Sequence, residues 1–333
     1  MKGDTGMGVL VTGAHGFVGL NVVRTLAESG VRVFALGRRE PDAWVRRFLA
    51  GVEDQVDHRI ADLTQPGQLA RALTHHDVNA VVHAAVVTAT TPEVEREQAA
   101  WIVAVNTAGT VEALELAVAK GARRFVYVSS PSALGTILPE GGPVDEHVVP
   151  RPESIYGITK LASEGLTHRY GQMHDLSTVS VRIAQPYGPG ERPTPSRLRT
   201  SPIYEWLRDA SRGLRLPTGP LGRARDWTYI DETARGIATL AVAEELPHDL
   251  YHLSYGQAVT VGEVIELLRG RYPQLTIDEQ PAPGTLNPNI AGPNRPPLDS
   301  TRFAADFGWS PQVTIEEGMR AYLDWWSQLE LWA

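Results

Sequence analysis

A glycine-rich turn close to the N-terminus constrains the fold of this chain more than any other feature. The residues Thr12-Gly13-Ala14-His15-Gly16-Phe17-Val18-Gly19 follow a short apolar run and precede a helical pattern that stops at Gly30. Glycines at such a junction allow a tight turn, and the N-terminus of the helix then offers free N–H groups to a phosphate. Helix packing alone would not explain why the glycines cluster here. We therefore expect a dinucleotide site lined by Gly13, His15, Gly16, Phe17, Val18 and Gly19.

Short apolar runs alternate with helical patterns through the first half of the chain. The runs at 9–11, 31–36, 58–60, 80–83, 125–129 and 179–183 have the length of buried strands, and helices are expected at about 17–29, 94–120 and 154–170. Short buried strands separated by helices are typical of a parallel sheet that is covered on both faces. The pattern predicts an α/β fold with a doubly wound parallel sheet, the Rossmann fold.

The second half of the chain changes character. Residues 185–199 are dense in Pro, Gly and Arg and predict a long loop, followed by helices near 203–212 and 232–244. Thr260 with Glu263, and Thr314 with Glu317, have the spacing of helix capping boxes. The segment 281–297 holds six prolines, which suits either a linker or a loop over a ligand. We expect a dinucleotide-binding domain at 1–184 and a smaller, mainly C-terminal α/β substrate region at 185–333, from which about 225–245 returns to the first domain.

The composition excludes several classes of protein. The 333 residues include no Cys, so disulfides, thiolate zinc sites and cysteine nucleophiles are absent. The histidine pairs lack carboxylates at ligand spacing, so we expect no metal. A net charge of −8 argues against nucleic acid as a partner. The most apolar run, 78–89, falls short of the roughly 20 residues of a membrane span, and residues 1–6 lack a signal core. We therefore expect a cytoplasmic protein with no membrane partner.

The end of the second predicted strand bears on the choice of dinucleotide. It reads Leu36-Gly37-Arg38-Arg39, with no carboxylate before Glu40. A carboxylate here would bind the ribose hydroxyl of NAD, whereas guanidinium groups suit the 2′-phosphate of NADP. Arg38 and Arg39 therefore favour NADP(H), NAD(H) stays possible, and a solvated basic helix start is the alternative. Asp62 and Leu63, after the third strand, are expected beside the adenine, with a turn role as the alternative.

Tyr156 and Lys160 are spaced to share one face of a helix, which places an ammonium near a phenol. A free Tyr titrates near pH 10, and a nearby ammonium together with an oxidised nicotinamide favours the phenolate. Ser129 and Ser130 end the preceding strand, where the carboxyl ends of parallel strands face the cofactor crevice. A hydroxyl is therefore expected beside Tyr156, although the two serines can also cap a turn.

These motifs, taken in order, resemble the extended short-chain dehydrogenase/reductase family over about residues 8–326. The resemblance rests on the glycine-rich turn, Asp62-Leu63, His83-Ala84-Ala85, Asn106, Tyr127-Val128-Ser129-Ser130 and Tyr156-x-x-x-Lys160. It implies that Ser130 is the catalytic serine, that Tyr156 is the acid/base and that Lys160 is its partner and a ribose ligand. It also implies a supporting role for Asn106, cofactor contacts from Ala84, Ala85 and Pro186, and a homodimer formed by the helices at 94–120 and 154–170.

The resemblance continues in the C-terminal half. Arg182-x-x-Gln185-Pro186-Tyr187-Gly188-Pro189 is similar to a family segment that has Asn in place of Gln185. The stretch that begins at Arg225-Asp226 resembles one whose Arg contacts a nucleotide-sugar diphosphate, and an internal ion pair is the alternative. By the same likeness the substrate is expected to contact Thr88, Ser132, Gln185, Arg225 and Arg295. Ser132 is also the less favoured alternative to Ser130 as the catalytic serine.

The resemblance implies hydride exchange between a nicotinamide and a carbon of a sugar or nucleotide sugar. Dehydratases of the family have an acidic pair after the catalytic hydroxyl, where this chain has Pro131 and Ser132. We therefore do not expect 4,6-dehydration. Because Arg38 and Arg39 favour an exchangeable NADP(H), we expect an NAD(P)-dependent oxidoreductase of the keto-sugar reductase type. A nucleotide-sugar 4-epimerase with tightly bound NAD is the alternative. A regulator that binds the cofactor without catalysis is an alternative of another class.

Overall fold

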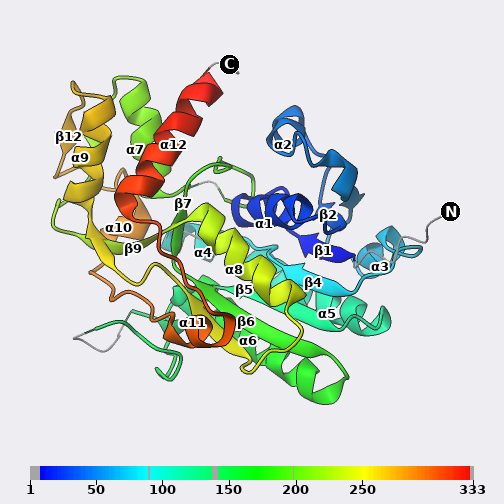
Figure 1. Cartoon of the computed structure of the whole chain (residues 1–333). Helices are drawn as coiled ribbons and strands as arrows, with labels where there is room; N and C mark the ends of the chain where they lie inside the picture. Colours follow the sequence, from blue (N-terminus) through cyan, green and yellow to red (C-terminus); the bar gives the residue numbers. More distant parts are fainter. Residues whose placement is uncertain (1–7, 89–90, 137–141, 198, 331–333) are drawn as a thin grey trace.

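A seven-stranded parallel sheet forms the larger part of the fold (Figure 1). The computed structural model describes residues 8–88, 91–136, 142–197 and 199–330, so the N-terminal segment before residue 8 lies outside it. The strand order is β3-β2-β1-β4-β5-β6-β10. The strands are β1 (Val9–Thr12), β2 (Val33–Gly37), β3 (Val56–Ile60), β4 (Ala80–His83), β5 (Arg124–Ser129), β6 (Ser177–Ile183) and β10 (Leu250–Leu253). The expected doubly wound parallel sheet is confirmed.

Helices cover both faces of this sheet. On one face, α1 (Phe17–Glu28) and α8 (Ile230–Val242) pack against each other and against the strands. Figure 1 shows these two helices side by side in front of the sheet, with α5 (Gly109–Ala119) and α6 (Ile155–Met173) on its other side. Successive strand residues point to opposite faces, so Val9 and Val11 belong to the core under α1 and Leu10 to the core under α5.

Two shorter helices pack on the first half of the fold. The helix α2 (Ala43–Phe48) begins at an Asp42 cap and adds Val45 and Phe48 to the core under α1. The helix α3 (Gln68–Ala72) contacts α5 on the other face. The strand order reverses between β1 and β4, and in such sheets a crevice for ligands forms at that point beyond the carboxyl ends of the strands.

A second region with its own apolar core stands beyond the carboxyl ends of the strands. It holds the three-stranded sheet of β7 (Gln185–Tyr187), β9 (Ala224–Tyr229) and β11 (Ala258–Thr260), and the pair β8 (Leu216–Pro217) and β12 (Ile277–Asp278). The helices α7 (Pro202–Ser211), α9 (Val261–Arg271) and α12 (Ile315–Glu330) pack around Trp206, Trp227 and Tyr322. Both expected capping boxes form, at Thr260 and at Thr314. The expectation of an unbroken loop at 185–199 is wrong, because β7 lies within it.

The segment that rejoins the larger sheet begins and ends later than the expected 225–245, because β9 belongs to the second region. After α8 the chain forms β10, which pairs in parallel with β6 at the edge of the seven-stranded sheet. The helix α11 (Thr301–Phe307) then contacts β10. The proline-rich segment between these elements contains the short helix α10 (Pro288–Ala291).

One helical stretch in the described chain is long and apolar enough to cross a membrane. It runs from Pro92 to Ala119 through α4 (Pro92–Val103), a π-helical turn at Ala104–Ala108 and α5. The expectation that no segment meets these criteria is therefore wrong. Half of its most apolar window is buried, because the stretch packs against α6 and the sheet, as a core helix does.

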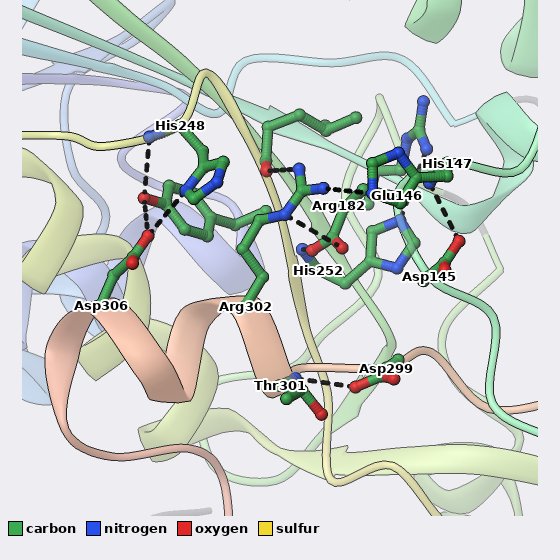
Figure 2. A network of polar contacts seen from close by, with 12 residues as sticks. Asp145, Glu146, His147, Arg182, His248, His252, Asp299, Thr301, Arg302 and Asp306 are labelled. Atoms are coloured by element: carbon green, nitrogen blue, oxygen red, sulfur yellow. Dashed lines mark hydrogen bonds and ion pairs between the residues drawn. The ribbon is translucent and has the colours of Figure 1, made fainter.

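A buried polar network joins α6, β6 and β10. The guanidinium group of Arg182 on β6 donates to both carboxylate oxygens of Glu164 on α6, at 2.9 and 2.7 Å. It also lies 3.4 Å from Nε2 of His252 on β10, whose Nδ1 is 2.9 Å from the Val144 carbonyl oxygen. Figure 2 shows Arg182 and His252 beside Glu146, which accepts a hydrogen bond from the His252 backbone N–H and pairs with Arg302. The network ties the edge strand β10 to the rest of the sheet.

The buried His252 should make the protein less stable in acid. Burial, with the charge of Arg182, lowers the pKa of His252 to about 3. The unfolded chain then takes up a proton below about pH 6.5 that the folded chain does not, so stability falls as the pH falls. Replacing His252 with Gln removes this effect. The unfolding free energy of the wild type, relative to His252→Gln, should drop by about 2 kcal/mol between pH 7 and pH 5.

Urea unfolding at the two pH values measures this difference. The variant His174→Gln, which changes an exposed histidine just beyond α6, provides the control and should follow the wild type. Equal pH dependence in His252→Gln and the wild type would show that burial of His252 has no such effect.

Candidate active site

A cavity of about 700 Å³ lies where the carboxyl ends of the strands meet the second region. Every residue expected at the dinucleotide, catalytic or substrate site lines this cavity, with the exception of Asn106. The proline-rich segment also contributes to the lining through Pro288, Asn289 and Gly292. Of its two interpretations, the loop over a cavity is the one that the structure shows.

The glycine-rich turn brings backbone close to backbone on two sides. Gly13 has a φ of +66°, and a Cβ there would lie 2.7 Å from the Ala85 Cα. A Cβ on Gly19 would lie 2.3 Å from the Gly13 carbonyl oxygen. The turn therefore fits against the segment after β4 and against the start of α1 only without side chains at these positions. This cradle fits the pyrophosphate of a dinucleotide at a helix N-terminus.

The residues after β2 and β3 form another part of the cavity. Arg38 and Arg39 are exposed, and the guanidinium carbon of Arg38 lies 5.7 Å from the centre of the Trp101 ring. An Asp62 carboxylate oxygen accepts hydrogen bonds from the backbone N–H and the hydroxyl of Thr64, at 2.9 and 2.7 Å. Asp62 therefore has the structural turn role that the sequence left open, and it lines the cavity as well.

Tyr156 and Lys160 lie one turn apart near the start of α6, which Ser154 caps. The Lys160 ammonium donates to the Val128 carbonyl oxygen at 2.7 Å, and its nitrogen lies 5.8 Å from the centre of the Tyr156 ring. Burial lowers the pKa of Lys160 to about 7, although the negative charge of Glu164 raises it in part. Lys160 is therefore close to its titration point at neutral pH.

Ser130 lies at the cavity beside Tyr156. Its Oγ accepts from the Ser132 backbone N–H at 3.2 Å and so caps the short helix Pro131–Leu134, the turn role left open by the sequence. Burial raises the pKa of Tyr156, while a hydrogen bond with the Ser130 side chain and the charge of Arg197 oppose that rise. In the absence of a dinucleotide, burial therefore dominates the pKa of Tyr156, and the expected effect of an ammonium together with an oxidised nicotinamide stays a prediction.

The end of β5 is held from behind by Glu164. The hydroxyl of Ser129, buried one residue before Ser130, donates to Glu164 at 2.5 Å. Glu164 lies one turn beyond Lys160 on α6, so one carboxylate is linked to Arg182, to the end of β5 and to the face that bears Lys160. This arrangement fixes the backbone that presents both Ser130 and the acceptor of Lys160, the Val128 carbonyl.

Asn106 acts at a distance from the reacting groups. It is buried in the π-helical turn, where its side-chain oxygen accepts from the Val87 backbone N–H at 2.8 Å. Its amide donates to the Val87 carbonyl at 3.1 Å and lies 3.2 Å from the Thr159 hydroxyl. Asn106 therefore positions the segment that leads to Thr88 and is not among the groups that face the cavity.

Arg225 ties the proline-rich segment to β9. Its guanidinium group donates to the carbonyl oxygens of Asn289 and Gly292, at 2.7 and 3.1 Å, and burial lowers its pKa to about 10. The alternative of an ion pair with Asp226 is wrong, because Asp226 accepts from Ser254 and from the Leu298 backbone N–H instead. Arg295 lies partly buried at the same cavity.

Several buried polar atoms of cavity-lining residues lack a hydrogen-bond partner within the described chain, and two of them belong to Gln185 and Asp226. The amide nitrogen of Gln185 and one carboxylate oxygen of Asp226 are buried without a hydrogen bond there. Burial raises the pKa of Asp226 to about 6. Because buried polar groups are normally satisfied, these two atoms suit a ligand that offers an acceptor and a donor. Sequence reasoning named Gln185 but did not include Asp226 in the site.

Three arginines of the cavity lining were also missed, namely Arg192, Arg197 and Arg199. Each pairs with a carboxylate, at 2.7 Å for Arg192 with Asp42, 2.6 Å for Arg197 with Glu191 and 3.0 Å for Arg199 with Glu205. The only signal for them in the sequence is the density of Arg in 185–199. These carboxylates offset the charge of the three arginines, whereas Arg225 donates to backbone carbonyl oxygens and keeps its positive charge at the cavity.

The fold and the site define an extended short-chain dehydrogenase/reductase: a Rossmann sheet with a glycine cradle, and Ser130, Tyr156 and Lys160 at one cavity. The chain belongs to the NAD dependent epimerase/dehydratase family, whose model matches residues 9–253.

Full-length relatives differ in their reactions. The chain is 28% identical over 326 residues to a UDP-glucuronate 4-epimerase of Thermodesulfobacterium geofontis, covering 95% of each chain. It is 27% identical to a GDP-6-deoxy-D-mannose reductase of Pseudomonas aeruginosa, covering 96% of this chain and 98% of the other. Relatives of similar identity also include dTDP-glucose 4,6-dehydratases. The structure of Thermus thermophilus UDP-glucose 4-epimerase in complex with NAD superposes with a TM-score of 0.80 and 27% identity, covering 96% and 98% of the two chains.

Proposed function

We propose that this chain interconverts the two configurations of a carbinol carbon in a nucleotide sugar, as a 4-epimerase. One observation carries the proposal: Ser130, Tyr156 and Lys160 line the same cavity as the glycine cradle and as Arg225 and Arg295. A dinucleotide at the cradle and a sugar diphosphate at the arginines would meet at these three side chains. The full-length similarity to 4-epimerases supports this reaction over the simple reduction expected from the sequence.

Each of the three side chains has a distinct task in this reaction. Tyr156 takes the hydroxyl proton of the substrate and later returns it, and Ser130 orients the substrate oxygen by a hydrogen bond. Lys160, held on the Val128 carbonyl, supplies an ammonium close to the phenol and to the dinucleotide. A dinucleotide bound at the glycine cradle would supply the hydride acceptor and donor for this reaction. Positioning of the reacting groups, rather than an unusual reagent, accounts for much of the expected rate.

Elimination of water receives no support from the residues that follow Ser130. Pro131 and Ser132 stand where an acid and a base for elimination are expected, and neither is a carboxylate. We therefore do not propose 4,6-dehydration, although dehydratases are among the relatives.

A second candidate is an NADP(H)-dependent keto-sugar reductase. The observation that favours it is the end of β2, where Gly37 is followed by the exposed Arg38 and Arg39 rather than by a carboxylate. Guanidinium groups at this point suit a 2′-phosphate, and a reductase must exchange its dinucleotide in every turnover. The similarity to a GDP-6-deoxy-D-mannose reductase is compatible with this candidate.

The dinucleotide that the purified protein retains distinguishes the two candidates. For an epimerase we expect NAD to be released when the purified protein is denatured, and UDP-galactose or UDP-glucuronate to be epimerised without added cofactor. Product that forms only when NADPH is supplied would reject the epimerase and favour the reductase. Binding of a dinucleotide without turnover of any nucleotide sugar tested would favour the non-catalytic regulator.

A further inference from the structure

We propose that His15 determines which dinucleotide this chain accepts, because its imidazole fills the space at the end of β2 that an acidic side chain would need. The inference rests on the proposed dinucleotide-dependent function and concerns the relative affinity for NADP(H) and NAD(H). A measured preference for NADP(H) would favour the reductase of the two candidates. It assigns a specificity role to one side chain of the glycine-rich turn.

The first observation concerns Gly37. This residue ends β2, lines the cavity and lies about 20 residues after the glycine-rich turn, where Rossmann folds that bind NAD carry an Asp or Glu for the ribose hydroxyls. A Cβ on Gly37 would lie 2.3 Å from Nδ1 and 2.5 Å from Cε1 of His15. The backbone of Gly37 does not have a left-handed φ, so the conformation itself would admit a side chain. The ring of His15 is the nearest obstacle to one, and the Arg39 carbonyl oxygen follows at 3.1 Å from the same Cβ.

The second observation concerns what holds His15 in this place. Its Nε2 lies 3.3 Å from Nδ1 of His58 on β3, and the two ring centres are 5.4 Å apart. Burial, and the neighbouring His58, lower the pKa of His15 to about 4, although Asp42 raises it in part. The ring is therefore neutral at neutral pH and fills space without adding charge to the subsite.

The third observation concerns the charged side chains that follow the end of β2. Arg38 and Arg39 are exposed at the cavity, with Arg38 above the Trp101 ring. Glu40, the first carboxylate after β2, lies 3.9 Å from Arg46 in an exposed ion pair. With His15 in place, the end of β2 has no carboxylate for a ribose diol and has two guanidinium groups for an anionic 2′ substituent. The ring of His15 thus occupies the space that a carboxylate at position 37 would need, and Arg38 and Arg39 are the charged groups that directly follow β2.

Four full-length proteins test this inference: the wild type, His15→Ala, Gly37→Asp and the double variant His15→Ala/Gly37→Asp. Fluorescence titration with NADH and with NADPH gives the dissociation constants, and thermal unfolding reports whether each protein folds. We expect Gly37→Asp alone to weaken both dinucleotides by about tenfold or more, because its side chain and the His15 ring compete for one space. In the double variant, affinity for NADH should return to within about threefold of the wild type, and affinity for NADPH should stay at least about tenfold lower.

Each outcome decides the matter. Equal affinity of Gly37→Asp and the double variant for NADH would overturn the inference, because His15 would then not compete with the new carboxylate. If Gly37→Asp fails to fold and the double variant folds, the steric conflict is demonstrated directly. Failure of both to fold would count against it, since removal of His15 should make room. A wild type that binds neither dinucleotide would reject the proposed function itself, and binding without turnover would reject only the proposed reaction.

Discussion

Replacing Tyr156 with Phe should lower kcat by about 10²–10⁴-fold, because it removes the group that transfers the substrate proton. The phenol lies at the cavity beside Ser130, and the ring itself remains in the variant. Dinucleotide affinity should therefore stay within about threefold of the wild type, since the binding surface is unchanged except for one hydroxyl. Steady-state kinetics together with a fluorescence titration of the dinucleotide separate the two effects.

The control for this substitution lies on the same helix. Tyr170 of α6 is partly buried and its hydroxyl donates to Glu115, so Tyr170→Phe removes a phenolic hydroxyl that does not line the cavity. Its kcat should remain within about twofold of the wild type. Because burial raises the pKa of Tyr156, little phenolate exists at neutral pH, and oxidation of the alcohol by the wild type should accelerate as the pH rises. Unchanged kcat in Tyr156→Phe would exclude Tyr156 as the acid/base.

Most strands of the seven-stranded sheet could be predicted because their own residues have the pattern of a buried strand. The runs at β1, β2, β4 and β5 are short, apolar and rich in β-branched residues, and the helices between them have the expected length. The strand β10 could not be predicted in this way. It has four residues and includes His252, which is buried only because β6 and the Arg182 network surround it. Its strand character thus depends on contacts with residues far away in the sequence.

The residues of the candidate site also fall into two groups, those that local sequence patterns predict and those that depend on contacts between distant parts of the chain. Gly13, Ser130 and Tyr156 lie at strand ends or helix starts, and in a parallel sheet those positions converge on one edge, so their order along the chain was enough. Arg197 belongs to a loop and reaches the cavity because the buried Glu191 holds it there. The contact between His15 and Gly37 joins two turns that are 22 positions apart in the sequence, and nothing local to either one indicates it. The spacing of motifs along the chain predicts which residues meet at the edge of the sheet, but it does not predict which of their side chains compete for the same space.

Replacing Arg182 with Met should destabilise the protein by about 3–5 kcal/mol, because it leaves the buried Glu164 carboxylate without its partner. Only 2% of the Arg182 side chain and 9% of the Glu164 side chain are exposed, so water cannot substitute for the lost ion pair. Urea unfolding at pH 7 measures the effect. A loss of unfolding free energy below about 1 kcal/mol would show that this buried ion pair stabilises the protein no more than an exposed ion pair does.

The double variant Glu164→Met/Arg182→Met separates the ion pair from its effect on the active site. Without the stranded charge, stability should return to within about 1–3 kcal/mol of the wild type, a remainder that reflects the unsatisfied Ser129 hydroxyl. A double variant less stable than Arg182→Met would contradict this reasoning.

Activity of the double variant should not recover with stability, because the charge of Glu164 raises the pKa of Lys160, which is only about 7. Once that charge is gone, Lys160 loses its proton at a lower pH, and kcat at pH 7 should fall even though the protein is folded. Full recovery of both stability and kcat would mean that Glu164 serves the fold alone.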